Sequence, residues 1–254
     1  MPSDRSAVLA VMAHPDDEFA IFPWLADAAR AGRRVHCVWL TDGAFGAQSA
    51  QRRADESIRA LQQFGIAPDS MTFLGQLHDI PDGHLYEMLP LAVRELESLA
   101  TRLPSPLQVL LPAWEGGHQD HDASHLAAIA ASRSVVGAQL WQYSLYHGAG
   151  LRGPFFRVLS PLQQNGSTTT LPTTMAERAS FVWACLGYRS QWKSFLGLLP
   201  FYALRLLRRD AFVLQPVEPT RTGERPHPGP MLYERRTHLT WSDFANATRD
   251  FRHH

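Results

Sequence analysis

The sequence lacks the features that mark several large classes of protein. Only two of its 254 residues are cysteines, Cys37 and Cys185, and both lie in apolar surroundings far apart in the chain, so we expect buried free thiols in a reducing compartment instead of a disulfide framework. No charge-free run reaches membrane-spanning length, and we expect no cleaved leader. Lys+Arg and Asp+Glu number 24 each, so no excess of positive charge favours nucleic acid as a partner.

Several catalytic motifs are missing as well. The chain has no G-x-S-x-G, no G-x-x-x-x-G-K-[ST], no H-E-x-x-H and no G-x-G-x-x-G, which argues against a serine hydrolase, a P-loop enzyme, a zincin and an NAD-binding protein. The apolar content of 45% and charged content of 19% are typical of a globular cytoplasmic protein. We expect residues 1–254 to form a single domain, with its core in about 5–145 and more irregular loops and helices in 146–254.

Strand and helix patterns alternate through the first half of the chain. Strands are expected at 7–13, 34–40, 71–74 and 107–111, and helices at 19–30, 49–64, 85–102 and 122–134. Such alternation predicts an α/β fold in which helices cover both faces of a mostly parallel sheet.

The second half follows a less regular pattern. In order, we expect a strand at 140–146, a polar surface loop at 163–174, helices at 175–187 and 192–209 with an interruption at Pro200, an extended loop at 216–230, a strand at 231–236 and a helix at 241–252. The stretch 195–209 mixes large apolar residues with arginines. We interpret it as a core or homo-oligomer interface helix, with weak contact to a membrane or a lipid-linked substrate as the alternative.

A cluster of one imidazole and three carboxylates, His14-Pro15-Asp16-Asp17-Glu18, follows the first expected strand. Pro15 ends that strand, because proline donates no ladder hydrogen bond. Carboxylates this close repel one another unless a cation lies between them, which favours a divalent metal site. The alternative is a solvated helix start whose acidic residues interact with the helix dipole.

A second cluster at 114–122 contains His118, Asp120 and His121 and follows the strand expected at 107–111. The carboxyl ends of parallel strands share one edge of a sheet, where ligands bind in open α/β folds. Two clusters of potential ligands at that edge favour the metal site over two unrelated helix starts.

His14-Pro15-Asp16-Asp17-Glu18 and His118-Gln119-Asp120-His121 resemble the two motifs of the LmbE/PIG-L family of zinc-dependent N-deacetylases. Weaker matches are Thr41-Asp42-Gly43, the R-x-x-E pattern of 53–56, Phe64-Gly65, Asp82-Gly83 and 188–191. The resemblance implies a Rossmann-like three-layer fold with the catalytic site at the carboxyl edge of the strands. It also implies removal of the N-acetyl group from an N-acetylglucosamine-type sugar or glycoconjugate.

The family pattern implies a role for each matching residue. His14, Asp17 and His121 would bind Zn²⁺, or Fe²⁺ or another divalent metal, and leave a position open for water. Asp16 would be the general base. His118 would stabilise the oxyanion or act as an acid, with Asp120 holding its tautomer and charge.

Several neighbouring residues have more than one interpretation. Arg53 either binds a substrate hydroxyl or phosphate or pairs with Glu56, and Asp42 either contacts substrate or forms a turn. Glu18 is interpreted as a helix cap and His125 as a support or surface residue. Gln119 stands where many family members have proline. The tyrosine that some members carry before this motif is absent here, and Tyr143 and Tyr146 are the candidates to replace it.

Two other functions stay open on the sequence. The first is an amidase of the same family that acts on a larger acyl or thiol-conjugate amide. The second is a non-catalytic domain that binds a metal or a sugar, which the presence of a candidate base beside the ligands disfavours.

Overall fold

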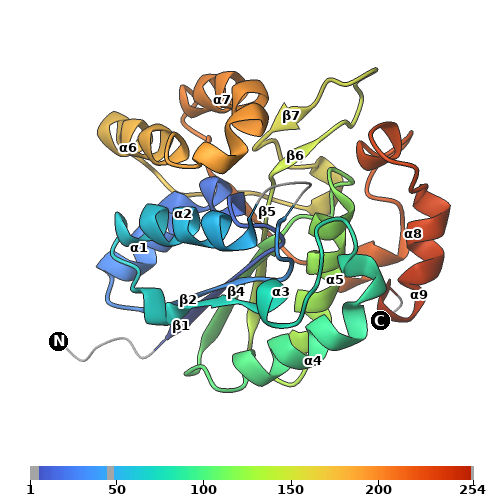
Figure 1. Ribbon diagram of the computed structural model, residues 1–254, viewed down its shortest axis with the longest axis horizontal. Coiled ribbons are helices and arrows are strands. Elements are labelled where there is room, and N and C mark those ends of the chain that lie inside the picture. The colour runs from blue at the N-terminus through green and yellow to red at the C-terminus, as the bar shows by residue number, and fades with distance from the viewer. Residues whose placement is uncertain (1–5, 45–48, 253–254) are drawn as a thin grey trace.

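The computed structural model describes residues 6–44 and 49–252 (Figure 1). The strands are β1 (Ala7–Met12), β2 (Arg34–Trp39), β3 (Met71–Phe73), β4 (Leu107–Pro112), β5 (Gln139–Tyr143), β6 (Tyr146–His147), β7 (Arg157–Val158), β8 (Thr169–Thr170) and β9 (Val213–Pro216). The α-helices are α1 (Phe22–Arg30), α2 (Ala50–Gln62), α3 (Leu74–Leu77), α4 (Leu89–Ala100), α5 (Gln119–Ser132), α6 (Met175–Cys185), α7 (Trp192–Leu206), α8 (Trp241–Ala247) and α9 (Arg249–Arg252). Short 3₁₀ turns include η1 (Asp17–Ala20), η3 (Leu85–Glu87) and η7 (Tyr233–Arg235).

Within the described residues, seven strands form one sheet in the order β3-β2-β1-β4-β5-β9-β8. The first five of these run parallel, whereas β9 is antiparallel to β5 and β8 is antiparallel to β9. Strands β6 and β7 make a separate antiparallel pair. The expected α/β fold with a mostly parallel sheet is therefore confirmed.

Alternate residues of β1 enter two different cores. Val8, Ala10 and Met12 pack in the core that includes residues of α1, α2, α6 and α7. Ala7, Leu9 and Val11 pack in the core that includes residues of α4, α5 and α8. Because successive side chains of a strand point to opposite faces, this apolar run requires cover on both sides. The result is the expected three-layer arrangement, with helices above and below the sheet (Figure 1).

The strand order changes direction between β1 and β4. The chain proceeds from β1 to β2 and β3 on one side of β1, and β4 and β5 lie on its other side. Ligands in open α/β sheets bind in the crevice at the carboxyl ends of the strands where this switch occurs. The His14 cluster follows β1 and the His118 cluster follows β4, so the topology places both at this crevice.

Several expectations for the second half of the chain are wrong. Residues 231–236 form no strand in the structure, and the 3₁₀ turn η7 lies there instead. The last strand is β9, which pairs with β5, and the segment expected to be a polar loop at 163–174 contributes β8 to the sheet edge. The strand expected at 140–146 is divided into β5 and β6. Pairing with distant strands decides these short elements, and the local pattern does not encode it.

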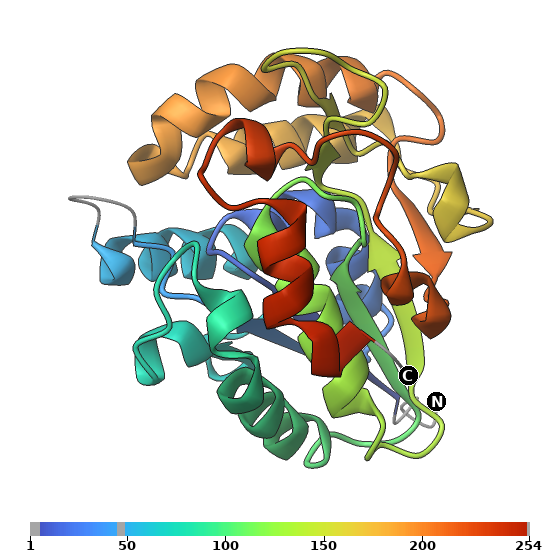
Figure 2. The same ribbon diagram turned by 90° about the vertical axis from the view of Figure 1, so that its right-hand side faces the viewer.

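Helix boundaries also depart from the sequence pattern. Helix α5 begins at Gln119, before the expected residue 122. Helix α7 continues through Pro200, because Phe195, Tyr202 and Leu206 are buried on both sides of the proline and hold both halves on the core. The expected last helix divides into α8 and α9, which lie against α5 (Figure 2). Across the described residues, no helix is long and apolar enough to cross a membrane.

Candidate metal centre

The turn after β1 is organised by the carboxylate of Asp17. Its Oδ2 accepts hydrogen bonds from the backbone N–H groups of Ala13 at 3.0 Å and His14 at 2.8 Å. Its Oδ1 is left facing Nε2 of His121 at 3.1 Å. Asp17 therefore fixes the backbone of the first cluster with one oxygen and presents the other to the second cluster.

The second cluster is fixed by the start of α5. His118 is the N-cap, and its Nδ1 accepts the backbone N–H of Asp120 at 3.2 Å, which leaves His121 in the first helical turn. A β-carbon on Gly117 would lie 1.8 Å from the carbonyl oxygen of Tyr146, so only glycine fits there. Asp122 Oδ1 accepts the N–H groups of Glu115 and Gly116 and completes the loop.

The two turns bring the three expected metal ligands together. One ligand atom from each of His14, Asp17 and His121 lies within 4.8 Å of the others, and all three residues are buried. The same separation holds for a second set within the described residues, consisting of His14, Asp82, His118 and Asp120.

The hydrogen bonds distinguish these two sets. Both carboxylate oxygens of Asp120 already accept backbone N–H groups, from Gly83 at 2.6 Å and Leu85 at 3.1 Å. Nδ1 of His118 is engaged by the helix cap. In contrast, Oδ1 of Asp17 and Nε2 of His121 bond only to each other in the hydrogen-bond network of the described residues. A metal that bound to His14, Asp17 and His121 would thus displace fewer hydrogen bonds than one bound to the second set.

Asp120 has a different partner from the one expected. Its carboxylate lies 3.0 Å from Nε2 of His14 but 3.9 Å from Nδ1 of His118. The backbone N–H of Asp120 contacts His118 instead. Asp120 therefore orients His14 and ties the loop at 83–85 to α5, and the tautomer of His118 is set by the helix cap.

Asp82 belongs to the site although the sequence assigned it no role. Its Oδ1 lies 3.2 Å from Nε2 of His14, and its Oδ2 lies 3.6 Å from Nη1 of Arg53. Burial alone would raise the pKa of Asp82, but His14, His118 and Arg53 together lower it. The match of Asp82-Gly83 to the family pattern was the available signal, because nothing in local periodicity places this loop over the sheet edge.

Arg53 reaches back from α2 to the first cluster. Its Nη2 donates to the carbonyl of Pro15 at 2.7 Å and lies 3.1 Å from Oδ1 of Asp16, and its Nη1 donates to the carbonyl of Gly43. The alternative pairing with Glu56 is not made, since Glu56 bonds to Ser190 and Arg52. With these donors engaged, the contacts favour a positioning role for Arg53 over direct binding of substrate.

Asp16 is the carboxyl group that Arg53 positions. Its φ is 129°, a conformation that strains a non-glycine residue, and its N–H donates to Oε2 of Glu18 at 3.0 Å. Burial raises the pKa of Asp16 to about 7, and the nearby Arg53 guanidinium opposes that increase. A carboxyl group with this pKa is suited to exchange a proton near neutral pH.

Three other candidates have structural partners. Glu18 accepts hydrogen bonds from Trp39 Nε1 at 3.2 Å and from the Tyr188 hydroxyl at 2.7 Å, so it supports the turn from beneath. Nδ1 of His125 donates to the carbonyl of Pro112 at 2.8 Å. Oδ1 of Asp42 accepts the N–H groups of Ala44 at 2.9 Å and Asp82 at 3.1 Å, so Asp42 holds the Asp82 loop.

The two tyrosine candidates differ in position. The Tyr146 ring lies with its centroid 5.3 Å from that of His121. The Tyr143 hydroxyl donates to the carbonyl of Val11 at 2.8 Å inside the sheet. Tyr146 is therefore at the candidate site, and Tyr143 is part of the core.

The charges of the site fit a divalent cation. Four carboxyl groups meet here, those of Asp16, Asp17, Asp82 and Asp120. The basic residues among them are Arg53 and the histidines. Burial disfavours the cation of His14, yet Asp82, Asp120 and Asp17 raise its pKa well above the usual value. Burial and the nearby His14 lower the pKa of His118 to about 4. A metal ion bound to His14 would replace the proton that these carboxylates attract.

Part of the chain is similar to a known family. Residues 9–132 match the model of PIG-L, described as GlcNAc-PI de-N-acetylase. No curated protein matches the chain.

Solved structures share the fold. A deacetylase of the teicoplanin biosynthesis pathway is 19% identical over 84% of this chain and 98% of its own, with a TM-score of 0.64. The A40926 pseudoaglycone deacetylase is 21% identical over 85% of this chain and 98% of its own, with a TM-score of 0.64. The N,N′-diacetylchitobiose deacetylase from Pyrococcus horikoshii is 16% identical over 83% of each chain, with a TM-score of 0.57.

Proposed function

We propose that this chain is a metal-dependent N-deacetylase that hydrolyses the acetamide group of an N-acetylated amino sugar or glycoconjugate, in line with the match of residues 9–132 to the PIG-L model. The observation that carries the proposal is the buried set of His14, Asp17 and His121, with the carboxyl group of Asp16 next to it. Deacetylases of sugar-containing compounds among the structural neighbours support the same reaction class.

His14, Asp17 and His121 would hold the metal, for which zinc is the first candidate and iron(II) the second. When bound, such an ion lowers the pKa of a coordinated water and polarises a carbonyl group. The remaining chemistry depends on groups of the chain itself.

Asp16 would act as general base and then as general acid. In its ionised form it takes a proton from the attacking water, and it delivers that proton to the nitrogen as the C–N bond breaks, so that a neutral amine leaves. The pKa of about 7 allows both directions of transfer near neutral pH. Arg53 fixes the carboxyl group through its contact with Oδ1.

His118 would stabilise the oxyanion that forms from the acetyl carbonyl. Its Nδ1 accepts the N–H of Asp120, so in the neutral ring the proton is on Nε2, from which it donates. The lowered pKa keeps the ring neutral at pH 7, which favours hydrogen-bond donation over service as a cationic acid. Oδ1 of Asp82 lies 4.0 Å from Nε2 of His118, so Asp82 would be within reach of a sugar hydroxyl bound beside His118.

The test is identification of the products. The protein, purified and supplied with zinc, is incubated with a panel of N-acetylglucosamine, N,N′-diacetylchitobiose and N-acetylglucosaminyl glycoconjugates. We expect acetate and primary amine in equal amounts from at least one of them. Cleavage of larger N-acyl amides with no reaction on the whole panel would replace this proposal with the amidase alternative.

A further inference from the structure

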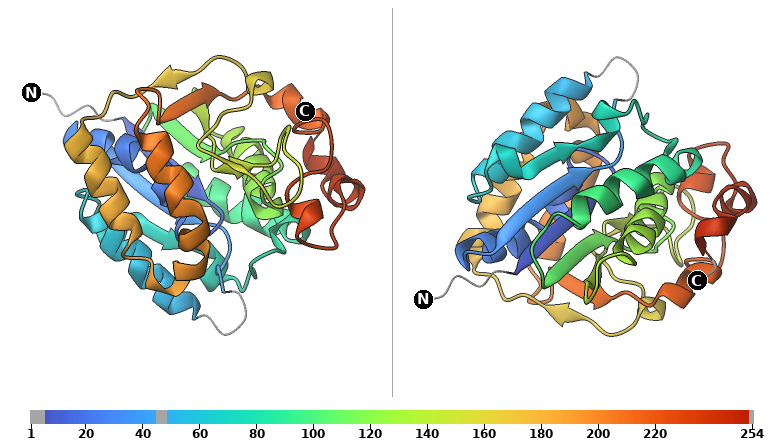
Figure 3. Two further views of the ribbon diagram at one scale, coloured as in Figure 1. Left: turned by 90° about the horizontal axis from the view of Figure 1, so that it is seen from above. Right: turned by 90° about the horizontal axis from the view of Figure 1, so that it is seen from below.

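Helices α6 and α7 bury one side and expose an apolar surface on the other. Phe181, Tyr202 and Leu206 pack into the core. The outward side chains, here called the α6–α7 face, are Met175, Trp183, Leu186, Trp192, Leu196, Phe201, Leu204 and Leu207. Trp183 is 71% exposed and Leu196 is 69% exposed, so these are not edges of the core. The two helices lie side by side on the outside of the molecule (Figure 3).

The charge around this face is one-sided. Residues 175–210 contain six lysines and arginines against two acidic residues, although the whole chain is balanced at 24 of each sign. The two acidic residues have partners, since Glu177 pairs with Arg30 and Asp210 with Arg205 and Arg208. Arg189, Lys193 and Arg209 are exposed beside the apolar residues. The face therefore combines exposed apolar side chains with unopposed positive charge.

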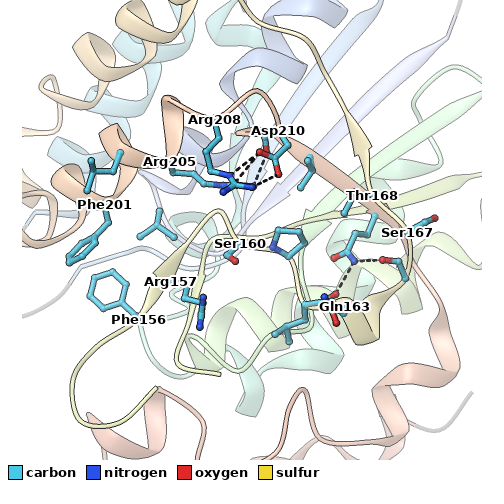
Figure 4. Close-up of a pocket in the computed structure, with 17 residues that line it drawn as sticks. Phe156, Arg157, Ser160, Gln163, Ser167, Thr168, Phe201, Arg205, Arg208 and Asp210 are labelled. Carbon is cyan, nitrogen blue, oxygen red and sulfur yellow. Dashed lines mark hydrogen bonds and ion pairs between the residues drawn. The ribbon is translucent and has the colours of Figure 1, made fainter. Parts of the chain in front are cut away.

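A pocket of about 770 Å³ borders the face at the carboxyl end of α7 (Figure 4). Phe201 and Leu204 form part of its wall. Arg205 and Arg208 at the end of α7 share one carboxylate, because both hydrogen-bond to Asp210, so one positive charge remains there. Arg189, Lys193 and Arg209 add exposed positive charge outside the pocket.

The face also lies near the candidate metal centre. Ring contacts connect Phe201 to Phe156 at 5.7 Å and Phe156 to Tyr146 at 5.9 Å, and Tyr146 contacts His121 at 5.3 Å. A partner bound on the α6–α7 face would thus be only a few side chains from the site.

We propose that the α6–α7 face docks the protein on the surface of an anionic lipid bilayer. Apolar side chains that enter the headgroup region, tryptophans at its border and cations that attract anionic lipids are the features of a peripheral membrane-binding helix. A second copy of the chain fits less well, because a two-fold contact would bring the same cations face to face. The docking needs no membrane-spanning helix and does not depend on the proposed reaction.

The test measures binding of the full chain to vesicles. Flotation with phosphatidylcholine mixed with phosphatidylglycerol is compared with phosphatidylcholine alone. We expect binding to the anionic vesicles that weakens with salt. The double variant Lys193→Gln, Arg209→Gln should bind roughly twenty-fold more weakly, because each cation near the surface contributes about fivefold. The double variant Leu196→Ser, Leu204→Ser should lose about tenfold or more, since it removes the inserted apolar groups.

A matched control replaces apolar residues that are equally exposed elsewhere. Leu77 and Val136 are 69% and 93% exposed and lie outside the face, so Leu77→Ser, Val136→Ser should bind as the wild type does. All variants change exposed side chains and should keep the wild-type melting temperature. Equal losses in the control, or no binding to anionic vesicles, would overturn the proposal. So would sedimentation that shows a dimer in solution, abolished by Leu196→Ser, Leu204→Ser, in place of vesicle binding.

Discussion

Nη2 of Arg53 lies 3.1 Å from Oδ1 of Asp16. This contact joins helix α2 to the turn after β1 at a carboxyl group whose pKa burial raises to about 7. The same nitrogen donates to the carbonyl of Pro15, so one guanidinium group holds both the backbone and the side chain of the turn. The consequences of removing it can be separated from those of removing the base itself.

Replacement of Arg53 should move the pH profile of the reaction. The guanidinium lowers the pKa of Asp16, so Arg53→Gln should raise that pKa. A base acts when deprotonated, so the acidic limb of the plot of kcat against pH should move to higher pH. The variant should therefore lose activity at pH 6 and recover part of it at pH 8. Arg52→Gln, which changes a neighbouring arginine that pairs with Glu56, should leave the limb in place. An unchanged acidic limb in Arg53→Gln would show that this contact does not set the pKa.

Replacement of Asp16 should separate metal binding from catalysis. Asp16→Asn keeps the size of the side chain and is expected to retain the metal, while kcat falls by roughly 10²–10⁴-fold, the usual contribution of a general base. Metal content and kcat are measured on the same preparation, with Asp69→Asn on the surface as the control. Wild-type kcat in Asp16→Asn would contradict the base role.

Loss of two ligands should abolish metal binding. The double variant His14→Ala, His121→Ala is expected to fall from about one zinc or iron per chain to background in elemental analysis, because a single carboxylate holds a catalytic metal poorly. His84→Ala removes an imidazole that is exposed and should leave the metal content unchanged. Retention of a full equivalent by the double variant would show that residues other than His14 and His121 hold the metal.

The two tyrosines should give opposite results. Tyr146→Phe removes a hydroxyl from the ring beside His121 and should lower kcat/KM about tenfold with little change in melting temperature. Tyr143→Phe removes the hydrogen bond to the Val11 carbonyl and should cost about 1 kcal/mol of unfolding free energy with kcat unchanged. The reverse pattern would assign the functional hydroxyl to Tyr143.

Glu115 should make the stability fall as pH rises. It is fully buried, with Ser144 and the N–H groups of Leu145 and Tyr146 as partners, and burial raises its pKa from 4.5 to about 7. Between these values the folded chain binds this proton more tightly than the unfolded chain. The stabilisation from this group is therefore complete below pH 4.5 and is lost as pH rises through 7, with a magnitude on the order of 3 kcal/mol.

The variant Glu115→Gln should lack this dependence, because its amide accepts the same N–H groups without ionising. Urea unfolding at pH 5 and pH 8 should show that the free energy of unfolding of the variant, relative to that of the wild type, is higher at pH 8 than at pH 5. Glu97→Gln, at an exposed position, is the control. A constant difference between Glu115→Gln and the wild type at both pH values would contradict the raised pKa.

The sequence by itself determined the framework and the candidate ligands. β1 is apolar throughout, and the second halves of β2 and β4 are apolar, because both faces of the sheet are covered; such runs are visible without a structure. The candidate ligands His14, Asp17 and His121 could be predicted because each belongs to a short motif directly after a strand, and topology brings parallel strand ends together.

Only the tertiary structure decided how the surrounding residues act. Asp82 enters the site because Asp42 and Asp120 hold its loop across the sheet edge, and those contacts join residues far apart in the chain. Arg53 pairs with Asp16 instead of Glu56, and the carboxylate of Asp120 contacts His14. Neither pairing follows from the spacing of residues along the chain, because packing decides the direction of each side chain. The apolar stretch of α7 was likewise ambiguous in sequence. Burial divides it into a core side with Tyr202 and Leu206 and an exposed side with Leu196 and Leu204, and which side meets solvent is set by the elements packed against it.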